Sequence, residues 1–214
     1  MGIICSPYLL FPNKYLINPI KIWIIGIIKI LYLTCNINYE IRGLNNIPKK
    51  GFIIASKHQS AFETFIFFLY LKNPIFIHKK QLFYIPIFGQ YLKKINMISI
   101  NRSQGTKAMR TILKKTKEKI NSGNSIIIFP EGTRKKPGDE PNYKSGIFGI
   151  YREAGVEIIP VALNSGLYWP KHTFVKNSGN IIIEFLNPIP PNLEKSALLE
   201  QIEKTIELNS KKLI

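Results

Sequence analysis

The chain has 214 residues, and 45% of them are hydrophobic, which is enough to bury a core of domain size and excludes a disordered chain. Lysine and arginine total 30 against 13 acidic residues, a formal net charge of +17, so we expect an acidic partner. Nucleic acid, an anionic bilayer, a phosphorylated metabolite and an acidic carrier protein are all partners that such a positive charge would attract. The two cysteines, Cys5 and Cys35, match no disulfide framework or zinc site.

The most apolar part of the chain is residues 16–33, which Lys21 and Lys29 interrupt. The uncharged stretch between these lysines is well short of the ~20 apolar residues that cross a bilayer, which disfavours a simple transmembrane helix. On a helical wheel the two lysines fall within one quadrant. This pattern predicts a helix that lies in a membrane interface with its lysines at the headgroups.

The start of this helix is predicted from Asn18 and Pro19, which suit an N-cap and a first helical position. We expect a shorter helix before it, so residues 1–35 are predicted to form a two-helix membrane-associating motif. The alternative is a helix buried against the globular domain.

From residue 36 onward, short β-branched runs alternate with amphipathic stretches. Strands are expected at residues 38–43, 51–56, 74–77, 97–101, 125–129, 157–163 and 180–186. Helices are expected at residues 61–71, from residue 104 to a C-cap at Gly123, and at residues 196–214. Continuous apolar strands separated by helices are typical of a parallel sheet covered on both faces. Residues 36–214 are therefore predicted to form one α/β domain, a largely parallel sheet flanked by helices.

Polar side chains follow several of the expected strands. His58 comes after residues 51–56, Arg102 after residues 97–101, and Glu131 after residues 125–129. In an open parallel sheet, ligands bind in the crevice beyond the carboxyl ends of the strands. We therefore expect these side chains to share one edge of the sheet.

The pattern of His58 and Glu63 has two interpretations, one structural and one catalytic. Ser60 and Glu63 fit a capping box of the following helix, and His58 fits a partly buried histidine bonded to a backbone carbonyl. Alternatively, Glu63 accepts a hydrogen bond from one imidazole nitrogen of His58 and leaves the other as a general base. Because no serine lies in a G-x-S-x-G motif and no cysteine lies near His58 in the sequence, the predicted nucleophile is a substrate hydroxyl.

His78 and His172 lack an acid nearby in sequence and are expected to be ordinary core or surface histidines.

The stretch FPEGTR, residues 129–134, reads either as a solvated turn or as a phosphate site. Pro130 and Gly132 fix the backbone at a strand end, and Arg134 with Arg102 offers guanidinium groups that suit a phosphate. No nucleotide-binding or zinc motif accompanies it.

These blocks resemble the glycerolipid acyltransferase family, which includes the 1-acyl-sn-glycerol-3-phosphate acyltransferases. KHQSAFE is similar to the family's His-x4-Asp block, SINR to its second block, FPEGTR to its third and IIPVALN to its fourth, in the same order. Position 63 departs from the pattern, because it is glutamate where the family more commonly has aspartate.

The resemblance implies transfer of a fatty acyl chain from acyl-CoA or acyl-carrier protein to the sn-2 hydroxyl of 1-acyl-glycerol-3-phosphate (lysophosphatidic acid), giving phosphatidic acid in phospholipid biosynthesis. It implies His58 as general base and Glu63 as its orienter. The substrate-binding residues that it implies are Lys80, Arg102, Glu131, Gly132, Thr133 and Arg134. It implies no metal and no cofactor beyond the thioester co-substrate, a membrane surface as partner, and a monotopic location on the cytoplasmic face of the inner membrane.

The residues of the sequence are also compatible with two other functions. One is acyl transfer to another lyso-lipid, such as a lyso-ornithine lipid or a lysophospholipid. The other is a basic, non-enzymatic protein that binds membrane or nucleic acid, although aromatic residues do not alternate with the basic ones as in a base-stacking surface.

Overall fold

The structure is a computed structural model that describes residues 9, 10, 12, 14–100 and 105–214. In these residues a seven-stranded sheet has the order β1-β7-β6-β2-β5-β3-β4. Its strands are β1 (Ile37–Arg42), β2 (Ile53–Ser56), β3 (Pro74–Lys79), β4 (Ile98–Ile100), β5 (Ser125–Ile128), β6 (Ile158–Leu163) and β7 (Gly179–Phe185). Neighbouring strands are parallel except for β6 and β7. The prediction of a largely parallel sheet with these strands is confirmed.

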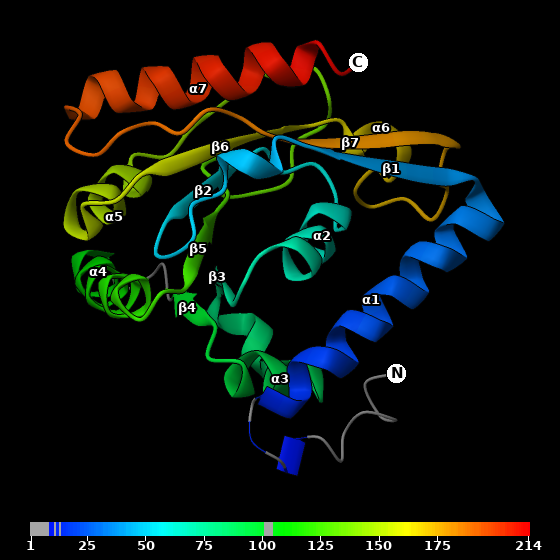
Figure 1. Cartoon of the computed structure of the whole chain (residues 1–214), viewed down its shortest axis with the longest axis horizontal. Coiled ribbons are helices and arrows are strands. Elements are labelled where there is room, and N and C mark those ends of the chain that lie inside the picture. Colours follow the sequence, from blue (N-terminus) through cyan, green and yellow to red (C-terminus); the bar gives the residue numbers. More distant parts are fainter. Residues whose placement is uncertain (1–8, 11, 13, 101–104) are drawn as a thin grey trace.

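Helices cover both faces of the sheet (Figure 1). The helical elements are α1 (Lys14–Cys35), η2 (Leu44–Asn46), α2 (Phe62–Tyr70), η3 (Lys80–Tyr84), α3 (Phe88–Lys94), α4 (Gly105–Asn121), α5 (Gly146–Ala154), α6 (Ser165–Tyr168) and α7 (Lys195–Lys211). Helices α4, α5 and α7 pack on one face, and α1 and α2 pack on the other.

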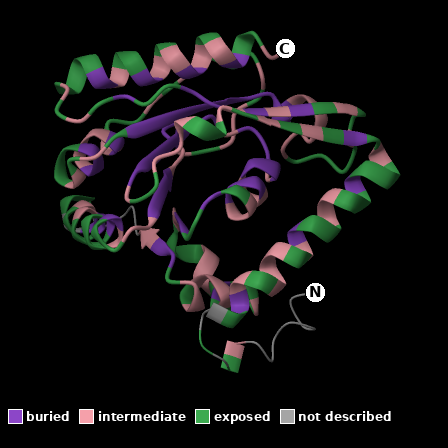
Figure 2. Ribbon diagram, in the orientation of Figure 1, coloured by how far each residue is buried: buried purple, intermediate pink, exposed green. Residues whose placement is uncertain are grey.

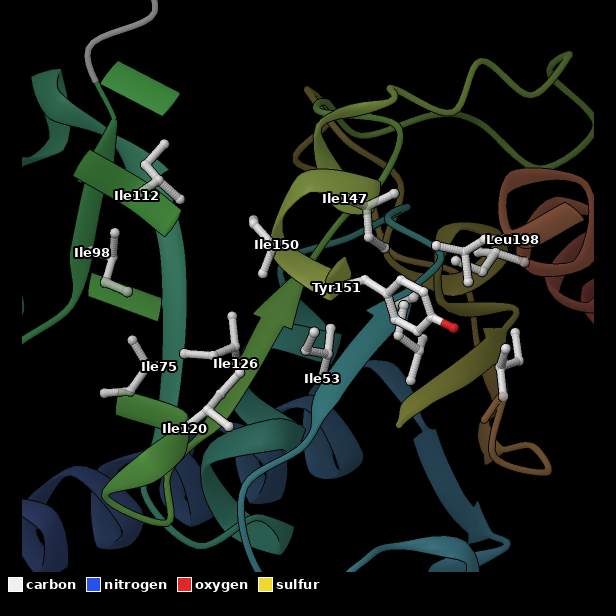
Figure 3. Close-up of a cluster of buried hydrophobic side chains, with 14 of the residues drawn as sticks. Ile53, Ile75, Ile98, Ile112, Ile120, Ile126, Ile147, Ile150, Tyr151 and Leu198 are labelled. Atoms are coloured by element: carbon white, nitrogen blue, oxygen red, sulfur yellow. The ribbon is translucent and has the colours of Figure 1, made fainter. Parts of the chain in front are cut away.

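The core lies on both sides of the central strands, which are the most buried part of the chain (Figure 2). Every residue of β2 and of β6 is buried, as expected for strands covered on two faces. In Figure 3 strand residues Ile53 and Ile126 lie in one cluster with Ile112 of α4 and Ile150 of α5. Burial of this apolar surface, at about 25 cal/mol per Å², is the main source of stability for the sheet.

Three predicted helices are confirmed with small shifts in their ends. Gly123 has a left-handed φ of 79° after α4, and its N–H donates to the carbonyl of Ile120 at 2.8 Å, as a C-cap glycine should. Helix α7 buries Leu198, Ile202 and Ile206, the face that its sequence pattern predicts. Helix α5 was not predicted, although Gly155 ends it in the left-handed conformation.

Helix α1 begins at Lys14, so the predicted start at Asn18 and Pro19 is wrong. Pro19 lies inside the helix, where it lacks the N–H for one intrahelical hydrogen bond, and Leu16 in the first turn is completely buried. The shorter helix expected before it falls within residues 1–13, most of which lie outside the described residues. The division of the chain at residue 35 stays a prediction.

Helix α1 buries one narrow stripe, and its other described side chains are half-buried or exposed. Leu16, Ile24 and Leu31 are buried, whereas Ile22 and Ile25 are exposed. At 22 residues the helix is about 33 Å long, and by length and composition it is able to cross a membrane, with a mean hydropathy of 1.8. Only 17% of its most apolar stretch is buried, so the alternative of a helix enclosed by the globular domain does not hold.

Candidate active site

Two loops meet beyond the carboxyl ends of adjacent strands. The first follows β2 and carries His58, and the second follows β5 and carries residues 129–134. Because β2 and β5 pair in parallel, both loops leave the sheet at the same edge. The Lys135 N–H donates to the carbonyl of His58 at 2.8 Å, which joins the loops directly. Their predicted meeting at one edge is thus observed, while Arg102 lies outside the described residues.

His58 is held by Glu63, the second residue of α2. The distance from His58 Nδ1 to Glu63 Oε1 is 2.8 Å, and Glu63 is completely buried. The same oxygen accepts the backbone N–H groups of Gln59 and Ser60, each at 2.8 Å. Glu63 Oε2 accepts the hydroxyl of Ser165 at 2.8 Å. The carboxylate is therefore fixed by several donors, so it both holds the backbone just before α2 and orients the imidazole.

Glutamate in place of aspartate at position 63 does not break this pair, because the longer side chain reaches the imidazole at ordinary hydrogen-bond distance. With Nδ1 engaged, Nε2 is the nitrogen of His58 that is available to take a proton. The side chain of His58 is 17% exposed and lines a large cavity.

Phe129 supports the other side of the imidazole. Its ring stacks on that of His58 with centroids 3.8 Å apart and an interplanar angle of 16°. Stacking and the bond to Glu63 together fix both the plane and the rotation of the imidazole. The sequence analysis did not assign a role to Phe129, although it is the first residue of FPEGTR.

A tight turn at Gly132 shapes the second loop. Gly132 has a φ of 67°, in the left-handed region that favours glycine, and its N–H donates to the carbonyl of Phe129 at 2.9 Å. The Lys144 N–H donates to the carbonyl of Pro130 at 2.9 Å. The turn brings Gly132, Thr133 and Arg134 to the wall of the cavity that His58 also lines.

Glu131 points away from this cavity. It is buried, its Oε2 accepts the His58 N–H at 3.0 Å, and its Oε1 lies 3.0 Å from Lys57 Nζ. Burial raises the pKa of Glu131, and the charge of Lys57 acts in the opposite direction. This placement favours a positioning role for Glu131 over the substrate contact that the resemblance implied. Lys80, at the start of η3, is exposed and does not line the cavity.

A buried ion network extends from Glu131 to the last helix. Lys57 Nζ lies 2.6 Å from Oε1 of Glu207 in α7, and the Tyr143 hydroxyl donates to the same oxygen at 3.0 Å. Burial lowers the pKa of Lys57, but the hydrogen bond to Glu207 and the charge of Glu131 outweigh it, so the pKa is raised. No sequence signal links Lys57 to Glu207, which lies 150 positions away.

The cavity measures about 1340 Å³. Polar residues on its wall include His58, Thr133 and Arg134, whereas most of the lining is apolar and comes from α1, α2, α3, α4 and α5. Its volume exceeds the roughly 300–1,000 Å³ of ordinary small-molecule sites. Such a site suits a substrate with a polar or anionic head and a long hydrocarbon chain.

No group of three or more His, Cys, Asp or Glu that could hold a metal occurs in the described part of the chain.

Comparisons with known proteins show which proteins this chain resembles. Residues 38–164 match the family model described as Acyltransferase. A 1-acyl-sn-glycerol-3-phosphate acyltransferase of Pseudomonas aeruginosa is 36% identical over 176 residues, which is 82% of this chain and 68% of that protein. One of Borreliella burgdorferi is 32% identical over 165 residues, 76% of this chain and 65% of that protein.

A solved structure has the same fold. The crystal structure of the 1-acyl-sn-glycerophosphate acyltransferase of Thermotoga maritima superposes with a TM-score of 0.77 and 24% sequence identity, covering 94% of this chain and 80% of that one. With the family match extending from β1 to the end of β6, and with the Pseudomonas relative aligned over most of both chains, this chain belongs to the acyltransferase family.

Proposed function

We propose that this chain transfers a fatty acyl chain from an acyl thioester to the sn-2 hydroxyl of 1-acyl-glycerol-3-phosphate, giving phosphatidic acid. The observation that carries the proposal is the His58–Glu63 pair on the wall of a large apolar cavity that also presents Arg134. The names of the Pseudomonas and Borreliella relatives support the same acceptor.

In the proposed reaction, Nε2 of His58 removes the proton from the acceptor hydroxyl, whose oxygen attacks the carbonyl carbon of the thioester. The tetrahedral intermediate then expels the thiolate, which takes the proton back from the imidazolium. Glu63 keeps Nδ1 protonated and stabilises the positive charge that forms on the ring. General-base catalysis of this kind contributes about 10²- to 10⁴-fold.

Phosphate recognition is proposed for Arg134 and Arg102, with Gly132 and Thr133 lining the approach. Lys80, which is exposed and does not line the cavity, is proposed only to add positive charge to the surface. A guanidinium group binds two phosphate oxygens at once, which fixes the head of the acceptor. The apolar wall would then hold a hydrocarbon chain.

The acyl donor is proposed to be acyl-CoA or acyl-carrier protein, both of which are acidic and suit the net charge of +17. The same charge favours the cytoplasmic face of the inner membrane, where anionic lipids create a negative surface potential. We propose a monotopic association there, through residues 1–35.

The test is mass-spectrometric detection of phosphatidic acid from lysophosphatidic acid and a long-chain thioester, with CoA and carrier-protein donors assayed separately. His58→Ala should abolish product, whereas His172→Ala, an exposed histidine outside the cavity lining, should retain it. Near-normal turnover by His58→Ala would rule out the proposed base. Product only from acceptors that lack a terminal phosphate would reassign the acceptor to another lyso-lipid.

A further inference from the structure

The connection between β3 and β4 carries an exposed apolar segment where η3 gives way to α3. Tyr84 is 73% exposed, Ile85 45% and Phe88 46%, and Pro86 is exposed between them. We call residues 84–88 the apolar tip. Single exposed apolar residues are ordinary, but four within five consecutive positions form a patch that normally has a partner.

The backbone holds the apolar tip in a defined shape. The Gly89 N–H donates to the carbonyl of Ile85 at 2.8 Å, and a Cβ added at Gly89 would lie 2.2 Å from the carbonyl oxygen of Phe83. Ile87 has a φ of 65°, which is strained for a β-branched residue. Such strain persists only where the surroundings determine the conformation, so the tip is a built feature of the connection between η3 and α3.

The apolar tip and helix α1 border the same cavity. Pro86, Ile87 and Phe88 line it, and so do Pro19 and Trp23 of α1. Helix α3 lies by the N-terminal half of α1, on the other side of the sheet from α7 (Figure 1). The tip and α1 therefore contribute apolar side chains to the wall of one cavity, and each also carries exposed apolar side chains of its own.

The charge around the apolar tip is uniformly positive. Lys79, Lys80 and Lys93 flank it and are exposed. Residues 64–117 contain no aspartate or glutamate at all, so no acidic side chain of this segment offsets that charge. An apolar centre bordered by lysines is the pattern of a surface that enters an anionic bilayer.

We propose that the apolar tip is a second membrane-contacting element, which enters the headgroup region of an anionic phospholipid bilayer beside α1. Two contacts on either side of the cavity would turn its opening toward the lipid. If the proposed function holds, the acceptor then passes from the bilayer to His58 without crossing water. A bilayer is favoured over a protein partner because the patch borders the same cavity as the exposed apolar helix α1, and its border is basic rather than mixed.

A fluorophore attached at the tip tests insertion directly. The full-length chain with Cys5→Ser and Cys35→Ser would carry Ile85→Cys labelled with an environment-sensitive dye, and Leu208→Cys on α7 would be the control, being 49% exposed. Vesicles of phosphatidylcholine and phosphatidylglycerol should increase the emission at position 85 and leave that at position 208 unchanged. Equal emission changes at the two positions, or none at either, would overturn the proposal.

A second measurement uses substitutions without a label. Tyr84→Ser with Ile85→Ser should weaken flotation with the same vesicles by about tenfold, because two apolar side chains no longer enter the interface. Leu208→Ser with Ile214→Ser removes two exposed apolar side chains elsewhere and should leave binding unchanged. Unchanged binding by a correctly folded tip variant would contradict the proposal. Neither measurement requires turnover. A negative result would therefore contradict the second membrane contact without contradicting the proposed acyl transfer.

Discussion

At the scale of single residues, the imidazole of His58 depends on a buried carboxylate. Burying an isolated charge is costly, and Glu63 avoids this cost by accepting hydrogen bonds from His58, Gln59, Ser60 and Ser165. Two of these donors are backbone N–H groups of the loop just before α2, so the residue that orients the imidazole also joins that loop to the helix. A substitution of Glu63 that keeps the shape of the side chain should therefore separate its effect on catalysis from its effect on folding.

Glu63→Gln should retain the fold, because an amide oxygen can accept the same backbone N–H bonds. Turnover should fall by about 10²- to 10⁴-fold, since the amide cannot stabilise the imidazolium. The measurements are steady-state turnover and thermal unfolding. Ser165→Ala is the control, because it removes one donor without removing the charge, and it should cost less than about tenfold. If both substitutions reduce turnover equally, the charge of Glu63 has no special role.

Gly132→Ala should weaken acceptor binding as well as stability. The alanine Cβ disfavours the left-handed φ of 67° by about 1–2 kcal/mol, and relaxing it moves Thr133 and Arg134 at the cavity wall. Gly138→Ala is a matched control, because Gly138 has a φ of 86°, and an added Cβ there has no neighbour within 4 Å. We expect similar losses of stability in both variants and a raised KM for lysophosphatidic acid only in Gly132→Ala.

At the scale of elements, helix α7 is joined to the two loops of the site through charge as well as packing. Lys57 lies between Glu131, which binds the His58 N–H, and Glu207 of α7. Its side chain is only 3% exposed, so removing one partner leaves charge buried without compensation. The network therefore positions the loop that carries His58 against the last helix of the chain.

Lys57→Met should destabilise the protein by about 3–5 kcal/mol, because it leaves the carboxylates of Glu131 and Glu207 without their cation. Combining it with Glu131→Gln and Glu207→Gln should recover part of that loss. Turnover should fall in the single variant through displacement of His58, with a smaller change in KM. Denaturant unfolding and steady-state kinetics measure the two effects. A triple variant no more stable than Lys57→Met would show that the network contributes little.

The raised pKa of Lys57 predicts how stability varies in alkali. A cation whose pKa is raised on folding contributes stability below its unfolded pKa and loses it as pH rises through the folded value. The free energy of unfolding should thus decline above about pH 10.4, the ordinary lysine value. Lys57→Met should show a shallower decline in the same range. Parallel pH profiles for the two proteins would contradict the prediction.

At the scale of the whole molecule, α1 and the apolar tip both carry exposed apolar side chains, while α7 covers the sheet on the opposite side (Figure 1). The exposed face of α1 can be changed without touching its buried stripe. Deleting residues 1–35 would also remove buried Leu16, Ile24 and Leu31, so substitutions on the exposed face are the cleaner test of membrane association.

Ile22→Lys with Ile25→Lys should release the protein from membranes into the soluble fraction while preserving the fold, because both side chains are exposed. A lysine on the apolar face of an interfacial helix opposes its burial in the acyl region. Ile24→Lys should instead unfold the region, because Ile24 is completely buried. The measurements are sedimentation with membranes and circular dichroism. Persistent sedimentation of the folded double variant would contradict anchoring by this face.

Local patterns were enough to predict the strands, the α/β class and the pairing of His58 with Glu63. Strand residues repeat apolar side chains over short windows, and the two members of the pair lie five positions apart at the start of one helix. The meeting of the loops after β2 and β5 was also predictable, because parallel strands place their carboxyl ends at one edge.

Only the tertiary structure decided the roles that depend on distant partners. The sequence by itself determined the fold class and the candidate residues for the chemistry, because strand patterns and motif spacing are local. Three such contacts join residues 71 to 150 positions apart in the sequence. They are the stack of Phe129 on His58, the hydrogen bond from the His58 N–H to Glu131, and the bond of Lys57 to Glu207. The start of α1 at Lys14, with Leu16 buried in its first turn, likewise differs from the capping preference of Asn18. Burial and long-range pairing depend on the packed fold, and no local window of sequence contains that information.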